Sequence, residues 1–334
     1  MGSGLPRPRQ RSEKDALMSA IKLAEVQVLL VEPNEEARRP LQDGLIAHGL
    51  KNTASVGSVA EAVALCRIRM FDLVIADHGL LKFQRNSLLK AIRFGEVGRN
   101  PFLVNFSTLQ SSTAGAVSQA INDGPDAVLA KPFAVSMLLD RVARMIDSRQ
   151  PFVVTGTYIG PDRRTVARPQ GAVAMLDVPN TLRDKALDQF DPARAFAEID
   201  AARAVVDTQM LAQNALVVTS VAREVVGLYD RGNVESSIRL LLDMLLERGR
   251  ETARRVTNTA DAHVAELCEG LVKVVEDIRG DYLAPSPKDV RLLQNLGLAI
   301  DMSLKPEEKI THLSKRIAYS VMEAKRRRPV QRVL

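Results

Sequence analysis

The strongest constraint on the fold is an alternation of short apolar runs with amphipathic stretches between residues 26 and 146. The apolar runs have the length of strands, and the stretches between them have helical spacing. The predicted strands cover 26–32, 52–56, 72–77, 102–106 and 126–131, and the predicted helices cover 35–47, 59–69, 86–93, 114–122 and 134–146. This alternation predicts a doubly wound α/β domain with five parallel strands.

Charged residues end three of these runs. Glu32 closes the first run, Asp77 closes the third, and Lys131 closes the fifth. The carboxyl ends of parallel strands lie at one edge of the sheet, where doubly wound folds bind their ligands. We therefore expect the three side chains to meet. Phosphoryl transfer to a carboxylate needs an acceptor, a fixed cation and a divalent metal, and this edge offers the residues for such a site.

This pattern resembles the receiver domain of bacterial two-component response regulators. The resemblance is carried by Glu32, by Asp77 and by the Lys131-Pro132 step. It implies a flavodoxin-like fold and phosphorylation of Asp77 by a histidine kinase or a phosphotransfer protein, with Lys131 bound to the phosphoryl oxygens. It further implies Mg²⁺ held by Glu32, Asp77 and the backbone carbonyl of Gly79. The peptide before Pro132 is commonly cis in that family.

The acidic pair of the family is incomplete in this chain. Receivers usually have two adjacent acidic residues after the first strand, and here Pro33 follows Glu32. Because Mg²⁺ sites with few carboxylates depend on each of them, we expect Mg²⁺ binding to be weak or absent. Two interpretations stay open: a receiver phosphorylated on Asp77, and a degenerate pseudo-receiver that serves as a protein-binding platform.

Two further positions depart from the family pattern. The fourth strand should end in Ser or Thr; counting from Pro101 the position holds Phe106, while counting from the acceptor it holds Ser107, with Thr108 next. We favour Ser107. The position three residues before the lysine, often an aromatic residue that moves on phosphorylation, holds Val128. The usual conformational switch is therefore expected to be altered or absent.

The remainder of the chain suggests three further segments. The predicted boundaries are a disordered leader over 1–22, with Met18 as a second start codon to consider, the receiver-like domain over 23–148, a linker over 149–190, and an all-α helical domain over 191–334 that ends in a basic tail. The linker prediction follows from scattered Pro and Gly without a sustained period.

The helical domain is predicted to contain long helices. Asp191-Pro192 is a good helix start, and apolar residues then recur at steps of three, four and seven as far as Leu228. A second long helix is expected from about Ile238 to Ile278, followed by two shorter ones over 288–302 and 306–327. Such stripes are buried either in an intramolecular bundle or in a bundle shared by a homodimer. We favour the homodimer as an output and dimerisation domain.

The apolar runs, the cysteines and the absence of known catalytic motifs reduce the number of possible functions. No apolar run approaches the ~20 residues that cross a bilayer, so no membrane insertion is expected. Cys66 and Cys268 lie in different predicted domains and are expected to be buried free thiols. No metal-ligand cluster, phosphate-binding loop or Ser-His-Asp pattern is present. We predict a cytoplasmic signalling protein that is not an enzyme, with an unknown downstream protein as its partner.

Two rival functions deserve tests. The first is a DNA-binding transcription regulator that uses the helices and the basic tails, although nucleic acid is not the partner we favour. The net charge of +6 is modest for 334 residues, and much of it lies in the tails. The second rival is a phosphorelay intermediate that uses His312, which has a lysine three residues later.

Overall fold

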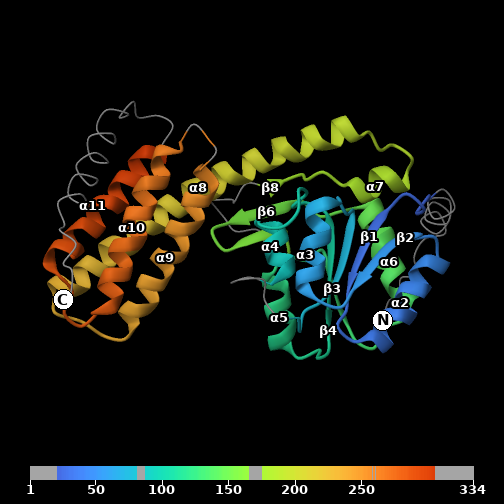
Figure 1. Ribbon diagram of the computed structural model, residues 1–334, viewed down its shortest axis with the longest axis horizontal. Helices are drawn as coiled ribbons and strands as arrows, with labels where there is room; N and C mark the ends of the chain where they lie inside the picture. Colours follow the sequence, from blue (N-terminus) through green and yellow to red (C-terminus); the bar gives the residue numbers. More distant parts are fainter. Residues whose placement is uncertain (1–20, 81–86, 165–174, 258, 260, 305–334) are drawn as a thin grey trace, which may run out of the picture. The chain divides into compact units, whose positions relative to one another are not determined.

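The structure is a computed structural model that describes residues 21–80, 87–164, 175–257, 259 and 261–304 (Figure 1). The chain forms two compact units, Met1–Ala204 and Val205–Leu334, which are described separately. Within the described ranges, no helix combines the length and the apolar character that a membrane crossing demands.

The first unit is built on a five-stranded parallel sheet with the strand order β2-β1-β3-β4-β5. This order is that of the flavodoxin-like fold, so the predicted fold class is confirmed. The strands are β1 Gln27–Val31, β2 Asn52–Val56, β3 Leu73–Asp77, β4 Val104–Leu109 and β5 Ala127–Ala130. The helices between and after them are α2 Glu35–Ala47, α3 Val59–Ile68, α4 Leu88–Arg93, α5 Ala114–Asn122 and α6 Val135–Asp147.

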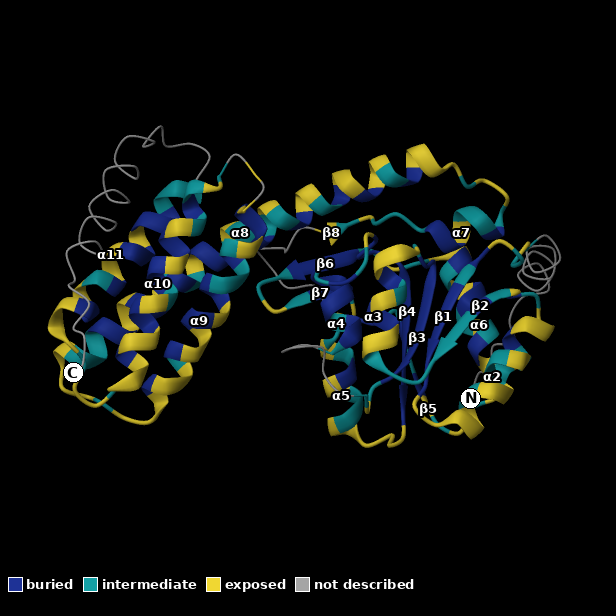
Figure 2. Ribbon diagram, viewed as in Figure 1, coloured by how far each residue is buried: buried dark blue, intermediate teal, exposed yellow. Residues whose placement is uncertain are grey.

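Side-chain caps fix where four of these helices begin. Asn34, Ser58, Ser87 and Thr113 each accept a hydrogen bond from a backbone N–H of the first helical turn. Such caps satisfy donors that the helix itself leaves unpaired. The helices α2 and α6 then cover one face of the sheet, and α3, α4 and α5 cover the other (Figure 1). The three inner strands, β1, β3 and β4, are buried almost throughout (Figure 2).

The segment after the sheet is not the structureless linker that the sequence suggested. Its described parts, 149–164 and 175–190, contain three strands and a helix, and we call this segment the strap. The elements are β6 Phe152–Thr155, β7 Tyr158–Pro161, β8 Met175–Leu176 and α7 Thr181–Ala186. The strands form an antiparallel sheet in the order β7-β6-β8. Leu182 and Ala186 of α7 belong to the same hydrophobic core as the β-sheet.

The strap lies against the amino ends of the parallel strands. Lys185 donates to Asp72, the residue directly before β3, at 2.8 Å. Arg149 donates to the carbonyl of Phe102, before β4, at 2.6 Å, and to Asp126, before β5. The strap is therefore a fixed part of the first unit, at the edge opposite Asp77.

The described residues of the helical unit form a bundle of four helices. They are α8 Pro192–Asp230, which begins in the first unit, α9 Ser237–Val256, α10 His263–Gly280 and α11 Pro287–Leu304. The second long helix predicted from the sequence is wrong, because the chain leaves the helix after Val256 and starts α10 at His263. The helix predicted over 306–327 lies outside the described residues.

The apolar stripes of these helices meet in one core. Residues from all four helices share it, among them Val218, Leu245, Leu271 and Leu293. Gly249 of α9 and Gly297 of α11 let the helices approach closely. A Cβ at Gly249 of α9 would lie 3.2 Å from Val272 of α10. The stripes thus find their partners within a single chain, which is the intramolecular alternative of the sequence analysis.

Candidate functional site

The carboxyl edge of the parallel sheet brings together three charged residues that lie far apart in the sequence. Asp77 is the last residue of β3, while Glu32 and Lys131 directly follow β1 and β5. Lys131 Nζ donates to Glu32 Oε2 at 2.5 Å and also to Asp77 Oδ2. Glu32 is 3% and Asp77 is 7% exposed, so little water screens these interactions. The predicted convergence of the three side chains is present in the structure.

Backbone groups hold the remaining carboxylate oxygens. The N–H of Asn34 donates to Glu32 Oε1 at 3.1 Å, and the N–H of Gly79 donates to Asp77 Oδ1 at 2.6 Å. The side chain of Asn34 is engaged as the N-cap of α2. Arg38 of α2 donates to the backbone carbonyl of Glu32 at 2.7 Å. Both carboxylates are therefore held in fixed orientations before any ligand binds.

The electrostatics of the site are set by Lys131. Burial disfavours its charged form, but the hydrogen bonds and charges of Asp77 and Glu32 outweigh burial and raise the pKa of Lys131 above its usual value. The lysine therefore stays protonated at neutral pH. With two carboxylates and one ammonium group, the cluster carries one net negative charge.

The strand register decides which hydroxyl lies level with the acceptor. In the parallel pair of β3 and β4, Asp77 is aligned with Thr108, and Ala76 is aligned with Ser107. Aligned residues of neighbouring strands face the same side of the sheet, and successive residues face opposite sides. Ser107 is fully buried, and its Oγ has no hydrogen-bond partner among the described residues. The register thus favours Thr108 over Ser107, the residue that the sequence favoured.

The strand order, the charged trio at the carboxyl edge and a cis peptide between Lys131 and Pro132 all coincide in the first unit. The first unit has the receiver fold. We use the name receiver domain for residues 21–147, the part that carries the five-stranded sheet and its five helices.

The chain was compared with family models, curated proteins and solved structures. No family model and no curated protein matches the chain. Among solved structures, an orphan response regulator of H. pylori is 22% identical, with 36% of this chain and 94% of that chain covered and a TM-score of 0.31. The receiver domain of the Francisella response regulator 1452 is 19% identical, with 35% and 93% covered and a TM-score of 0.32. A response regulator from Thermotoga maritima is 23% identical, with 37% and 98% covered and a TM-score of 0.32.

The oxygen donors at the carboxyl edge of the sheet fit Mg²⁺ with a short list of protein ligands. Mg²⁺ is commonly bound by one or two carboxylates, with water completing its octahedron. Glu32 and Asp77 could supply the carboxylates and the Gly79 carbonyl a third oxygen. Pro33 supplies none. Among the described residues, no group of three or more His, Cys, Asp and Glu side chains is placed to hold a metal ion.

A histidine beside the acceptor has a partner that the sequence did not reveal. The side chain of His78 is only 22% exposed, and its Nδ1 lies 3.4 Å from Asp123 Oδ2. Asp123 caps the carboxyl end of α5. Nothing local in the sequence indicates this pair, because the two residues are brought together only by the fold. His312, the rival phosphotransfer residue, lies outside the described residues.

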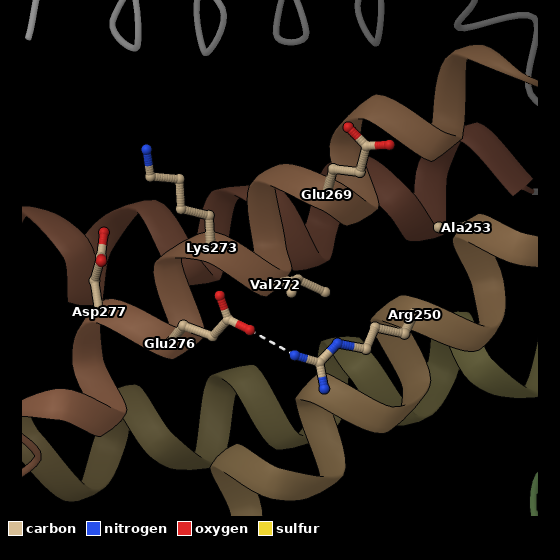
Figure 3. Close-up of a pocket in the computed structure, with 7 residues that line it drawn as sticks. All are labelled: Arg250, Ala253, Glu269, Val272, Lys273, Glu276 and Asp277. Carbon is tan, nitrogen blue, oxygen red and sulfur yellow. Dashed lines mark hydrogen bonds and ion pairs between the residues drawn. The ribbon is translucent and has the colours of Figure 1, made fainter. Parts of the chain in front are cut away.

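The helical unit contains an open groove between α9 and α10 with a volume of about 470 Å³ (Figure 3). Ala253 and Val272 contribute apolar surface, and Glu269 and Lys273 line it with opposite charges. An ion pair between Arg250 and Glu276 crosses from α9 to α10. The lining contains no cysteine, serine, threonine or histidine.

The two thiols behave as the sequence predicted. Cys66 and Cys268 are free and buried. Burial raises the pKa of Cys66 to about 11 and that of Cys268 to about 12. Both therefore remain protonated at neutral pH, which makes them poor nucleophiles and poor metal ligands.

Proposed function

We propose that this chain is a signalling protein of the response-regulator type, whose receiver domain accepts a phosphoryl group on Asp77 and thereby controls the helical unit. A histidine kinase or a phosphotransfer protein would be the donor. The observation that carries the proposal is the contact of Lys131 with both Asp77 and Glu32 at the carboxyl edge of the sheet.

The proposed transfer uses residues with fixed positions. A carboxylate oxygen of Asp77 attacks the phosphorus atom of a phosphohistidine, the P–N bond breaks, and the donor imidazole leaves with the bonding electron pair. The product is an acyl phosphate on Asp77. The ammonium group of Lys131 then pairs with the phosphoryl oxygens, because a fixed cation stabilises charge that develops there. Mg²⁺ held by Glu32 and Asp77 would neutralise further phosphoryl charge.

Asp77 is already oriented for attack before a phosphodonor binds. Its carboxylate is fixed by Lys131 and by the N–H of Gly79, so little reorganisation is needed before attack. Thr108, which is aligned with Asp77 in the register, is the hydroxyl that we propose for the phosphoryl group. Ser107 remains the alternative that the sequence favoured.

The test of this proposal is acyl-phosphate formation on the full chain. Incubation with a small phosphodonor and Mg²⁺ should add one phosphate by intact-mass spectrometry, and the Asp77→Asn variant should gain none. Asp140→Asn, which changes an exposed aspartate of α6, is the matched control and should label like the parent. Equal labelling of Asp77→Asn would place the acceptor elsewhere. No labelling of the parent would leave the pseudo-receiver interpretation.

A further inference from the structure

The contact between the receiver domain and the start of α8 has no role in phosphoryl transfer itself. Arg99, in the loop after α4, places its Cζ 4.0 Å from the ring centre of Phe196. Its Nη2 lies 3.7 Å from Asp200 Oδ2, and its backbone carbonyl accepts from Arg203 Nη1 at 3.3 Å. Residues at these spacings of four and three share one face of a helix. One face of α8 therefore surrounds a single receiver residue.

The loop that carries Arg99 follows α4, which is the first described helix after Asp77. β3 ends at Asp77, and α4 covers Leu88–Arg93. All of α4 except Lys90 is buried. A helix packed in this way cannot shift without moving its neighbours, because protein interiors are close-packed. A change at the acceptor that reaches α4 must therefore also reach the loop that carries Arg99.

The carboxyl end of α4 is anchored by Arg93. This arginine is 1% exposed and donates to the backbone carbonyls of Gly124, Pro101 and Leu103 and to Asp126 Oδ2, at distances of 2.7 to 2.9 Å. Asp126 is held from its other side by Arg149 of the strap. The strap is thus fixed to the sheet through buried charges, and its arrangement is costly to change.

The contact of Arg99 with α8, by contrast, is exposed to solvent. The side chains of Arg99 and Asp200 are 56% and 60% exposed. Exposed ion pairs contribute little to stability, so this contact can form and break at low cost. The structure therefore contains a fixed connection, through the strap, and a changeable one, through Arg99, at the same edge of the sheet.

We propose that α4 and the loop after it carry the response from Asp77 to α8, by changing the stacking of Arg99 on Phe196. This inference rests on the proposed function, because it needs phosphorylation of Asp77 as the input. The position three residues before Lys131 holds Val128 instead of an aromatic residue, so an aromatic switch at that position is absent from this chain.

The chain offers a direct reporter for this contact because it contains no tryptophan. Phe196→Trp introduces the only tryptophan of the chain, which can be excited selectively and can stack with Arg99. On treatment with a small phosphodonor and Mg²⁺, its emission should shift while intact-mass spectrometry shows phosphate on Asp77. Adding Arg99→Ala should abolish the shift and leave the phosphate. Met137→Trp, an exposed position on α6, is the matched control and should not respond.

A second measurement avoids any change at Phe196. Hydrogen exchange of the α8 amides over 195–203 should become faster when the parent is phosphorylated, and it should not change in Asp77→Asn. Phosphate on Asp77 without a change in emission or exchange overturns the inference and leaves the proposed function intact. A shift that persists in Arg99→Ala also overturns it. Absence of phosphate on Asp77 overturns both proposals.

Discussion

At the scale of single residues, two carboxylates and one ammonium group lie close together at the carboxyl edge of the sheet. Lys131 neutralises one of the two carboxylates, Glu32 and Asp77, and each carboxylate also accepts a backbone N–H. An incoming phosphoryl group adds negative charge to this cluster. Lys131 must therefore divide its interactions between the carboxylates and the new oxygens, and any further cation or hydroxyl that reaches those oxygens should speed the transfer.

The hydroxyl at this edge gives the first prediction. Thr108→Val keeps the shape of the side chain and removes the hydroxyl, so labelling of Asp77 should slow by about 10- to 100-fold, which corresponds to the loss of one hydrogen bond in the transition state. Ser107→Ala removes a buried hydroxyl that has no partner among the described residues, and labelling should stay close to the parent rate. Stopped-time mass spectrometry of both variants measures the rates. A larger effect of Ser107→Ala would restore the assignment that the sequence favoured.

Pro33 gives the second prediction. Pro33→Asp places a third carboxylate beside Glu32 and Asp77. Without metal, the added repulsion should lower the melting temperature, because like charges a few ångströms apart disfavour joint ionisation. With Mg²⁺, the new carboxylate becomes a ligand, and binding to the folded state raises stability by mass action. The Mg²⁺-dependent rise in melting temperature should therefore be larger in the variant, as should the labelling rate. Pro33→Ala controls for the loss of proline.

The sequence predicted the convergence of the three charged residues but not the register that aligns Thr108 with Asp77. Glu32, Asp77 and Lys131 are charges at the ends of apolar runs, and strand order alone brings them to one edge. The fourth apolar run was predicted to end at Phe106. In the structure β4 continues through Leu109. Strand register is set by contacts between strands, so counting along one strand could not supply it.

At the scale of elements, the largest difference between the sequence prediction and the structure is the strap. Its strands are four residues long or shorter, and Gly160 and Pro161 in β7 are residues that weaken a strand signal. Its main attachment is the buried set of Arg93, Asp126 and Arg149, whose two guanidinium groups also lie 4.8 and 4.9 Å from the ring centre of Phe152. Charged residues are usually exposed to solvent, so this buried attachment could not be predicted from the sequence.

The closest backbone approach of the strap gives the third prediction. Gly124 has φ +74°, and a Cβ there would lie 2.1 Å from the backbone oxygen of Ile159. Gly124→Ala should lower the free energy of unfolding by about 2 kcal/mol or more, from the strained backbone and the clash together. Gly115→Ala, in α5 with no atom within 4 Å of the new methyl, should instead raise it by up to about 1 kcal/mol. Denaturant titration of both variants measures the difference, and equal effects would contradict the packing of the strap.

Asp126 gives the fourth prediction, a dependence on pH. Burial alone would raise the pKa of Asp126, but Arg149 and Arg93 outweigh it and lower the pKa below the ordinary value of 3.8. A carboxyl with a depressed pKa contributes stability above its unfolded pKa and loses that contribution as the pH falls through the folded value. Asp126→Asn should cost about 3–5 kcal/mol at neutral pH, because two buried arginines lose their counter-charge. The difference from the parent should shrink below pH 3.8. A constant difference in acid titrations would contradict the ion pairing.

At the scale of the whole molecule, the chain consists of two units, and the continuous helix α8 contributes residues to both. The sequence predicted the α/β unit closely because strand and helix periods alternate in it. It predicted the helical unit less well. The apolar spacing of α9 and α10 runs through their junction, so a periodicity argument joined them into one helix. Spacing alone also could not decide whether the stripes meet within one chain or between two.

The last prediction concerns that choice. The stripe residues of α8, α9, α10 and α11 form a single core in one chain, and Val218, Leu245, Leu271 and Leu293 are all fully buried there. A homodimer that shared the bundle would have to expose this core before exchanging helices, so we expect the unphosphorylated chain to run as a monomer of 36.6 kDa in light scattering at tens of micromolar. Leu240→Ser, at a side chain that is 72% exposed on α9, should leave both the mass and the melting temperature unchanged. A dimer that Leu240→Ser dissociates would show that the chain associates through the outer face of the bundle. A dimer that persists in this variant and dissociates only on unfolding would favour the shared bundle that the sequence suggested.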